Sequence, residues 1–438
     1  MKLSILPHND NNNGWLRILP ELPLANVLRG EHSFDVAIVG AGFTGLAAAR
    51  RLGELCPDER IALIDAGRIG NNAAGRCSGF AIDQAHNIRA KSFADELANE
   101  RFQLQLNRHG QQALRDAVEQ HAIDCDWQEA GKIHGAGTVK GQQLLRDLSK
   151  NIEALGNSCE FYDAEKMQSV TGLRFYREGL YTPGTQQMQP AALVRGLAKT
   201  LPENVAVYED SLITDVEYGD SHRLISSDGE LQANTLVLAN NSFAAAFGFY
   251  EKHLIPLPTF ASMTRELTAS ELDTLGGEQS WGIVPAHPFG STVRRLNSNR
   301  LLVRNIYAYS HKHNPTESQR QWARGKHIKS FKDRFPMLDK VEFEYSWGGT
   351  LCLSDNGKPV FGEVAPRVFA SLCHQGVGIA RGTSCGKLIA EEVAGEESDL
   401  LSAMRAEGRP NKSFPSWMMR IGAPLNLANR RRMAGGEL

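Results

Sequence analysis

The sequence predicts an α/β (α+β) fold of two intertwined domains, and three observations lead to this prediction. An apolar run at 35–39 is followed by a glycine-rich turn and a second apolar run at 61–64, which is the pattern of a βαβ unit. A third apolar run, at 236–239, is typical of a parallel strand that is buried on both faces. The segment 301–307 instead fits a strand of a second, mostly antiparallel domain.

Composition and charge limit the classes of protein to which the chain can belong. With 438 residues, of which 42% are hydrophobic and 22% charged, the chain can bury one large core or two. A formal net charge of −2, with no long Lys/Arg run before the tail, argues against a nucleic-acid partner. The seven scattered cysteines form no CxxC pair, so they favour reduced thiols over a disulfide framework or a metal site.

Neither an export signal nor a membrane span is visible in the sequence. Residues 1–13 are polar and Asn-rich, unlike a signal peptide. No apolar stretch approaches the length of about 20 residues that a spanning helix needs. We therefore expect a cytoplasmic protein without a transmembrane segment, and its oligomeric state stays open.

The turn between the first two apolar runs indicates nucleotide binding. Gly40 permits the tight turn out of the strand, Gly42 lets the backbone approach a diphosphate, and Gly45 allows the helix to pack on the sheet. The diphosphate of a dinucleotide then lies at a helix N-terminus, where N–H groups and the helix dipole favour an anion. Asp65, twenty positions after Gly45, can accept hydrogen bonds from ribose hydroxyls.

The segments around this unit predict further elements. Residues 1–33 form a leader that we expect to pack across the domain surface. The small, Gly-rich segment 66–79 suits a backbone that lies against something flat or anionic. Residues 91–122 have helical apolar spacing, and Pro190 near the first turn marks a helix over 190–201.

A second group of strands makes the first domain discontinuous. We expect a turn at 227–229 and strands at 205–209, 212–218, 223–226 and 235–239. The predicted boundaries are a leader at 1–33, a first domain at 34–84, 202–248 and 346–400, a second domain at 85–201 and 249–345, and a C-terminal tail at 401–438.

Four blocks of the chain match the pattern of one known family. They are Asp35 to Gly45 with Asp65, Ala66 to Gly79, Gly179 to Val194, and Trp347 to Ala380. In order and spacing they resemble the D-amino-acid oxidase (DAO) superfamily, and most of all its glycine and sarcosine oxidase and γ-glutamylputrescine oxidase branch. The resemblance covers most of the chain. It implies a glutathione-reductase-like Rossmann domain that binds FAD rather than NAD, and a substrate domain built on an antiparallel sheet.

The resemblance also implies which residues hold FAD. The first βαβ unit would bind the adenosine, and the backbone of Ile213 would touch the adenine. Residues 376–379, near the start of a helix over 383–393, would direct N–H groups toward the flavin edge that becomes negative on reduction. The implied set is Gly40, Gly42, Phe43, Thr44, Gly45, Asp65, Ala66, Arg68, Gly75, Arg76, Cys77, Ser78, Ile213, Ala239, Asn240, Gly376, Val377, Gly378 and Ile379.

The chain departs from this branch where a pocket above the flavin would lie. Ala74 and Cys77 stand where the branch usually has Ser and Asn. His374 stands where Gly is common, and Arg381 where Pro is common. Arg304 lies where the family often has small residues. These departures leave the substrate open.

Three residues are candidates for the substrate pocket. Arg304 could bind a substrate carboxylate in a bidentate pair, or form an ordinary ion pair. His374 could contact the flavin or influence proton transfer, or be a hydrogen-bonded core histidine. Tyr307, with Trp281, could line a pocket for a cationic or apolar amine, or pack in the core.

Other candidates carry less specific patterns. His86 follows the Gly-rich loop. Cys77 and Cys373 could form a thioether to the flavin or respond to oxidation, although a free Cys is usually a small buried hydrophobe. The tail 413–438 could lie on a membrane surface as a basic amphipathic helix, but the preferred interpretation docks it on its own protein with its arginines solvated.

The resemblance implies an FAD-dependent oxidoreductase that oxidises a C–N bond of an amine or amino acid. A hydride would pass to flavin N5, and water would hydrolyse the resulting imine. O2 is the expected electron acceptor. The alternatives are an amine dehydrogenase that uses another acceptor, a nicotinamide-dependent dehydrogenase, and an accessory biosynthetic flavoprotein that does not turn over free amines.

Overall fold

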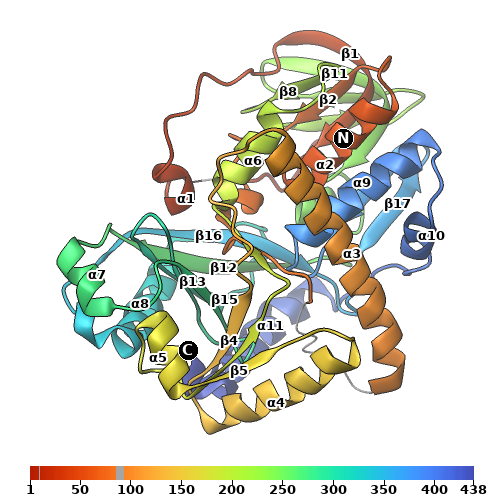
Figure 1. The fold of residues 1–438 in the computed structure, drawn as a ribbon. Coiled ribbons are helices and arrows are strands. Elements are labelled where there is room, and N and C mark those ends of the chain that lie inside the picture. The colour runs from red at the N-terminus through yellow and green to blue at the C-terminus, as the bar shows by residue number, and fades with distance from the viewer. Residues whose placement is uncertain (9, 85–92) are drawn as a thin grey trace.

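The computed structural model describes residues 1–8, 10–84 and 93–438. Figure 1 shows two units, one in the upper and one in the lower half of the view, each built around a β-sheet with helices beside it. The chain passes between the two sheets several times, so each unit is assembled from separated segments. The long helix α3 (Phe93–Gln120) runs along both units.

The first sheet is mainly parallel and has the strand order β17-β18-β11-β1-β2-β8. The antiparallel pairs of this sheet are β17 with β18, β10 with β11, and β9 with β10. Strands β1 and β2 have neighbours on both sides and apolar side chains on both faces, so a separate core forms on each face of the sheet. The strands are β1 (Gly30–Val39), β2 (Ile61–Ile64), β8 (Val205–Tyr208), β9 (Asp215–Glu217), β10 (His222–Ile225), β11 (Gly229–Leu238), β17 (Val360–Ala365) and β18 (Val368–Leu372).

Helices α2 and α9 cover one face of this sheet and pack closely on each other. A Cβ added at Gly386 of α9 would lie 2.2 Å from the Thr44 backbone oxygen of α2. Side chains of α3 and α6 complete the core on this face. The helices of this unit are α1 (Gly14–Arg17), α2 (Phe43–Leu55), α6 (Pro190–Lys199), α9 (Ala380–Ala394) and α10 (Asp399–Arg405), with the 3-10 turns η1 (Ala73–Arg76) and η2 (Asn241–Ala245).

The second sheet has the order β16-β12-β15-β14-β13-β4-β6-β5, and only β13 and β4 pair in parallel. Phe331 and Phe335, at one end of α8, join apolar side chains of this sheet in a third core. Its strands are β4 (Lys132–Ala136), β5 (Glu160–Asp163), β6 (Glu178–Thr182), β12 (Ile255–Thr264), β13 (Trp281–Pro285), β14 (Thr292–Arg295), β15 (Leu301–Tyr307) and β16 (Phe343–Leu353). The remaining elements are α4 (Val139–Ala154), α5 (Ala164–Thr171), α7 (Ala269–Leu275), α8 (Glu317–Arg334), α11 (Ser416–Ala434), the turns η3 (Pro336–Leu338) and η4 (Gly435–Glu437), and the pair β3 (Phe80–Ala81) and β7 (Gln186–Gln187).

The predicted fold class is confirmed, because a mainly parallel sheet assembled from distant segments stands beside a mostly antiparallel one. The differences concern element bounds. β1 begins at Gly30, inside the predicted leader, and α9 begins at Ala380 rather than at 383. The predicted strand 212–218 is reduced to β9, and Ile213, just before it, lines a cavity.

Most of the leader runs over the surface, as expected, but the short helix α1 within it is buried. Trp15, on the single-turn helix α1, is only 1% exposed and packs in a small core with Trp347 of β16 and Ala191 of α6. Asn13 caps this turn by accepting a hydrogen bond from the Trp15 N–H at 3.2 Å. The leader therefore joins elements of both units.

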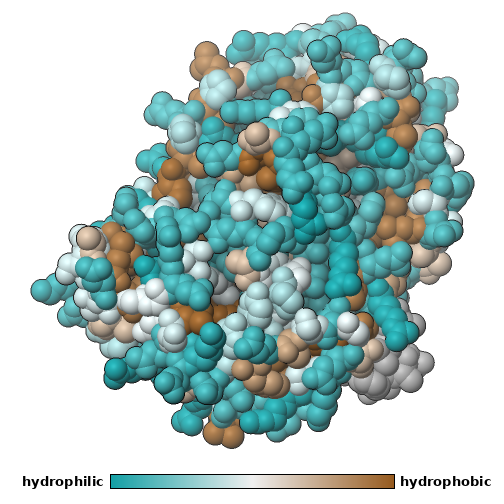
Figure 2. Space-filling model, in the orientation of Figure 1, coloured by the Kyte–Doolittle hydropathy of each residue, from teal (hydrophilic) through white to brown (hydrophobic). Residues whose placement is uncertain are grey.

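The molecular surface in the view of Figure 2 is mainly hydrophilic. Apolar side chains on this face form small groups separated by polar ones. Over the ranges that the structure describes, none of the helices combines the length and the apolar character required to cross a membrane.

Replacing Gly45 by Ala tests how closely α2 packs on the turn after β1. The added Cβ would lie 1.8 Å from the Gly40 carbonyl oxygen, so we expect the free energy of unfolding to fall by about 3 kcal/mol or more. Denaturant unfolding measures this change. Gly325→Ala in α8 is the matched control, because no atom lies within 4 Å of its added Cβ and helix propensity favours Ala by about 1 kcal/mol. Equal stability of the two variants would contradict the close approach.

Candidate active site

The carboxyl ends of the central parallel strands meet at one cavity. Gly40 follows β1, Asp65 follows β2 and Ala239 follows β11, and all three line it. This edge is where open α/β sheets bind their ligands. The cavity has a volume of about 1000 Å³ and is also lined by residues of the second sheet.

Two helices begin at this cavity, one early and one late in the chain. Gly42 precedes the first residue of α2, Ile379 precedes that of α9, and both line the cavity. The first N–H groups of a helix have no partner within it, and the helix dipole makes this end positive. Thr44 Oγ1 lies 2.9 Å from His374 Nε2 and so ties the two helix starts together. The arrangement favours a ligand with negative charge.

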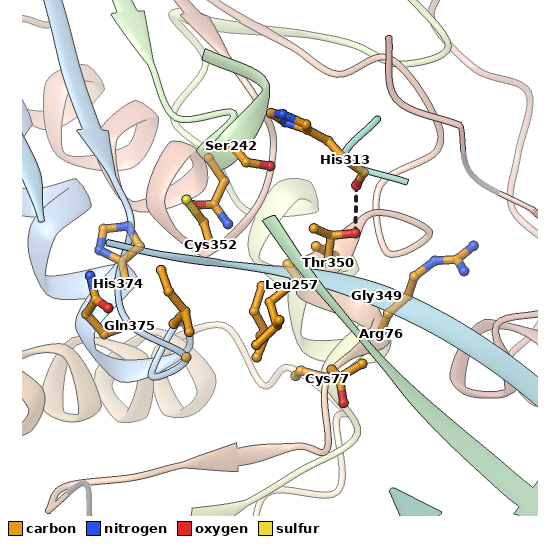
Figure 3. A pocket seen from close by; sticks show the side chains of 18 of the residues that line it. Arg76, Cys77, Ser242, Leu257, His313, Gly349, Thr350, Cys352, His374 and Gln375 are labelled. Atoms are coloured by element: carbon orange, nitrogen blue, oxygen red, sulfur yellow. Dashed lines mark hydrogen bonds between the residues drawn. The ribbon is translucent and has the colours of Figure 1, made fainter. Parts of the chain in front are cut away.

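His374 is neutral at neutral pH. Burial, followed by the charge of Arg381, lowers its pKa to about 3. Its Nδ1 atom is buried and has no partner within the described structure. Its neighbours Cys373 and Gln375 have φ angles of 66° and 53°, in the region that favours glycine, so the loop carrying the imidazole is held in an unusual conformation. In Figure 3, His374 and Gln375 lie on one side of the cavity and Cys77 on another.

Asp65 organises the turns at the end of the sheet. Its Oδ2 accepts hydrogen bonds from the Ala41 N–H (2.9 Å) and from Asn72 Nδ2 (3.1 Å), and its Oδ1 accepts one from the Gly67 N–H (3.0 Å). Burial raises the pKa of this carboxyl, and the three hydrogen bonds oppose the rise. Asn72, which the sequence did not single out, also lines the cavity, and its Oδ1 is buried without a partner among the described residues.

The Gly-rich loop is held by side chains from the leader and the second sheet. Each of the four consecutive carbonyls at 76–79 accepts a hydrogen bond from a buried side chain. Trp347 and Trp15 donate their indole N–H groups to the first two carbonyls, at 3.0 and 2.8 Å. Arg294 donates to the last two, at 2.8 and 3.1 Å. Burial lowers the pKa of Arg294 to about 10, so it remains charged at neutral pH.

The two arginines predicted to bind the cofactor use their charge elsewhere. Arg76 donates to Asp10 Oδ1 at 2.9 Å and to the Gly348 carbonyl at 3.0 Å. It lines the cavity, but Figure 3 shows its guanidinium pointing away from the other labelled side chains. Arg68 donates to the Pro23 carbonyl at 2.6 Å and does not line the cavity.

An irregularity in β15 turns two side chains toward the cavity. Ile306 has a φ angle of 59°, which is rare for a β-branched residue, and the pairing of β15 with β12 shifts register beside it. Ile306 packs in a cluster with Ala323 of α8. Arg304 and Tyr307 both line the cavity, although strand alternation would place them on opposite faces. The guanidinium carbon of Arg304 consequently lies 4.6 Å from the centroid of the Tyr307 ring.

Arg304 is half-buried and is not neutralised by a neighbouring acid. Within residues 1–8, 10–84 and 93–438, its side chain contacts the Tyr307 ring but forms neither an ion pair nor a hydrogen bond. The ordinary ion pair considered from the sequence is therefore not what the structure contains there. A guanidinium in this state retains the planar set of donors that binds a carboxylate in a bidentate manner.

The C-terminal helix α11 closes part of the cavity, with Met419, Ala423 and Asn426 in its wall. The tail therefore docks on its own protein, as expected, and Arg432 is exposed, but Arg430 and Arg431 are half-buried rather than solvated. Arg430 lines the cavity, and Arg431 donates to the backbone carbonyl of Tyr307 at 3.2 Å. The residues that these arginines contact are distant in sequence, so the sequence pattern of the tail does not predict the contacts.

Most of the predicted site residues line this one cavity. They are Gly40, Gly42, Phe43, Thr44, Asp65, Ala66, Arg76, Cys77, Ser78, Ile213, Ala239, Asn240, Arg304, Tyr307, His374, Gly376, Val377, Gly378 and Ile379. Besides Arg68, the structure leaves Gly45 and Gly75 out of the wall. Both allow the backbone to pack closely instead. A Cβ added at Gly45 would lie 1.8 Å from the Gly40 carbonyl oxygen, and one added at Gly75 would lie 2.0 Å from the Gly70 carbonyl oxygen.

The other candidates from the sequence have different surroundings. Cys77 lines the cavity, but burial raises the pKa of its thiol to about 11, so it is not a thiolate at neutral pH. Trp281 lies in the core of the second sheet, and Cys373 in a core of the first. His86 falls outside the residues that the structure describes.

Thr44→Val removes the hydroxyl that faces His374 Nε2 and keeps the shape of the side chain. A buried ring nitrogen would lose its partner, so we expect the free energy of unfolding to fall by about 1 to 3 kcal/mol. Thr44→Ser retains the hydroxyl and is the matched control. Denaturant unfolding of both variants measures the effect, and a Val variant as stable as the Ser variant would show that the contact is not stabilising.

Lowering the pH from about 7 to about 5 should destabilise the protein through His374. Its folded-state pKa of about 3 lies below the value of about 6.5 expected for the unfolded chain, so only the unfolded state takes up the proton in this range. The stability contributed by the neutral imidazole is present above the unfolded pKa and is lost as the pH falls, by about 1 to 2 kcal/mol at pH 5. Denaturant unfolding at both pH values should show a smaller pH effect in His374→Gln. The same pH effect in both proteins would contradict the assignment.

Comparisons with known proteins agree with this arrangement. Residues 35–392 match the DAO family, described as FAD dependent oxidoreductase. The chain is 27% identical over 409 residues to the probable oxidoreductase OrdL of Rhizobium meliloti (strain 1021), covering 90% of this chain and 91% of that protein. It is 25% identical over 369 residues to the gamma-glutamylputrescine oxidoreductase of Escherichia coli (strain K12), covering 83% and 84%. The crystal structure of glycine oxidase from Geobacillus kaustophilus has a TM-score of 0.70 at 21% identity, covering 84% of this chain and 96% of that one.

The family match extends from β1 to α9 and so includes both helix starts at the cavity. The structural likeness independently confirms the fold. The resemblance that the four sequence blocks suggested is thereby confirmed, and FAD is the cofactor of this family. The chain belongs to the DAO family of FAD-dependent oxidoreductases.

Proposed function

We propose that the cavity holds the FAD, with the predicted cofactor residues in its wall as the binding groups. Three buried polar atoms in this wall support the proposal, because each lacks a partner among the described residues. They are Asn72 Oδ1, Asn240 Oδ1 and His374 Nδ1. Buried polar atoms are rarely left without a hydrogen bond, so a polar ligand is expected to satisfy them.

The helix starts also leave room for a close approach. A Cβ added at Gly42 would meet only the Ala74 side chain, at 3.5 Å, and one added at Gly378 would meet nothing within 4 Å. The start of α2 would bind the diphosphate, and the start of α9 would stabilise the negative edge of the reduced flavin. Asp65 and Asn72 would bind the ribose of the adenosine.

We infer that the substrate is an amine or amino acid whose C–N bond is oxidised. When bound, FAD supplies a two-electron acceptor for the hydride on the carbon next to the amine nitrogen. Arg304 would hold a carboxylate of the substrate, and Tyr307 would keep the guanidinium in place through the contact of its ring. Because His374 is neutral, it adds no positive charge that would repel the amine. Leu257 and Phe289 in the same wall would exclude water from the reacting carbon.

The uncompensated charge of Arg304 is the observation that carries this proposal. A half-buried guanidinium in a ligand cavity favours an anion, and the described residues place no acidic side chain in an ion pair with it. The names of the relatives point in the same direction, since one acts on gamma-glutamylputrescine and another on glycine. An amino acid or a γ-glutamylated amine would bring the required carboxylate together with the nitrogen.

An anaerobic screen tests the proposed function. The purified FAD-loaded protein is mixed with amino acids, N-methyl amino acids, γ-glutamylated polyamines and plain amines, and the flavin absorbance is followed. We expect bleaching by a substrate that carries both a carboxylate and an amine nitrogen. Readmitting O2 then distinguishes an oxidase, which recovers its colour rapidly and forms peroxide, from a dehydrogenase that needs another acceptor. Bleaching by none of these compounds would instead favour an accessory flavoprotein.

Arg304→Gln should weaken binding of a carboxylate-bearing substrate selectively. Loss of a charge-assisted bidentate pair is expected to raise the Kd measured by anaerobic flavin reduction about 10- to 100-fold. The Kd of the matching amine without a carboxylate should change by about twofold or less. Arg304→Lys keeps the charge without the planar fork, so an intermediate loss is expected. An equal loss for both compounds would show that Arg304 acts only on the structure of the cavity.

A further inference from the structure

We propose that the outer face of α11 docks on the surface of anionic lipid membranes without crossing them. The opposite face of the helix lines the cavity through Met419, Ala423 and Asn426. The outer face carries Trp417, Ile421 and Leu425, which are spaced four residues apart and therefore form one stripe. We call these three residues the outer stripe.

The outer stripe is unusually exposed for its composition. Trp417, Ile421 and Leu425 are 65%, 62% and 66% exposed, and Phe414 just before the helix is 62% exposed. Of the fourteen large apolar side chains that are exposed in the described part of the chain, six lie within 414–433. Such a concentration marks an interaction surface, whereas scattered apolar side chains need no explanation.

The charge around the outer stripe indicates which surface it fits. From residue 409 to the end, the chain has a single acidic residue, Glu437, and that residue is buried. The same segment has six basic residues, in a chain whose net charge is −2. A helix with Trp and aliphatic residues on one face and arginines beside them lies at lipid interfaces, and anionic headgroups attract its basic residues. The six are Arg409, Lys412, Arg420, Arg430, Arg431 and Arg432. Arg430 and Arg431 are half-buried against the protein, so the four exposed ones, Arg409, Lys412, Arg420 and Arg432, are available to headgroups.

A second copy of the chain fits this face less well than a lipid surface does. In a two-fold dimer the same patch meets itself. Arg420 and Arg432 of both copies, all exposed, would then share one interface in which the tail offers no exposed acidic side chain to compensate them. Like charges placed together oppose association, whereas an anionic membrane supplies the missing negative charge.

The ends of the segment are fastened to the protein, which leaves the outer stripe facing outward. Before the helix, the Ser413 N–H donates to the Lys252 carbonyl at 2.6 Å. After it, Glu437 accepts a hydrogen bond from the Thr138 N–H at 2.9 Å, and Arg334 donates to the Leu438 carbonyl at 3.0 Å. A docked membrane would thus lie directly outside the helix that closes the cavity.

Co-sedimentation of the full-length, FAD-loaded protein with lipid vesicles tests the proposal. We expect binding to vesicles that contain phosphatidylglycerol, weak binding to vesicles of phosphatidylcholine alone, and loss of binding as the salt concentration rises. Replacing Trp417, Ile421 and Leu425 together by Ser should weaken binding to the anionic vesicles about tenfold or more. Vesicle binding needs no substrate, so the result is independent of the proposed amine oxidation.

A matched control removes three exposed apolar side chains from other parts of the surface. Leu24, Phe161 and Ile328, which are 97%, 43% and 39% exposed, are replaced together by Ser, and this variant should bind like the wild type. Arg420→Gln combined with Arg432→Gln should weaken binding about tenfold or more at low salt. Flavin absorbance and melting temperature verify that each variant is folded.

Three results would overturn the proposal. They are no binding to anionic vesicles, equal binding to both kinds of vesicle, and equal loss of binding in the control variant. Self-association that the outer-stripe variant abolishes, without any vesicle binding, would likewise overturn it and would assign the face to a second copy of the chain.

Discussion

The buried backbone of the loop 76–79 is the constraint on which the arrangement of the site depends. A backbone with small side chains forms a flat wall that a ligand can approach closely. The buried carbonyl groups of such a loop, however, need hydrogen-bond donors. Trp15, Trp347 and Arg294 supply these donors from the leader and from the second sheet. The two units are therefore joined by hydrogen bonds at the wall of the cavity itself.

The parallel half of the site was predictable because its requirements are local in sequence. A tight turn after a buried strand needs Gly40, whose φ angle is 106°, and the helix that follows packs closely only because Gly45 lacks a Cβ. The same reasoning applies to the turn that leads into α9, where Gly376 has a φ angle of 84°. The apolar runs thus predicted the strand edge and the first helix start, whereas the second helix start was implied by the family resemblance and lies at Ala380 rather than at 383.

The second half of the site depends on contacts between distant segments, which local patterns do not reveal. Arg68 and Arg76 follow the nucleotide-binding unit in sequence, as cofactor-binding residues would. Their guanidinium groups instead donate hydrogen bonds to the leader, to the Pro23 carbonyl and to Asp10 Oδ1, respectively. The common face of Arg304 and Tyr307 results from a register shift between β12 and β15. A bulge of this kind is decided by how two strands pair, and the sequence of either strand alone does not specify it.

Charge is distributed unevenly along the cavity, and this distribution follows from burial. The two helix starts make one part positive through backbone dipoles, and Arg304 makes another part positive through its side chain. His374 stays neutral because it is buried and because Arg381 lies nearby, so a positive charge on its imidazole would be unfavourable. Hydride transfer from an amine requires an unprotonated nitrogen, and the positive charge of Arg304 and of the helix starts favours the free amine over its ammonium form. The same positive charge favours a carboxylate elsewhere on the molecule, and amino acids that carry both groups therefore meet both demands at once.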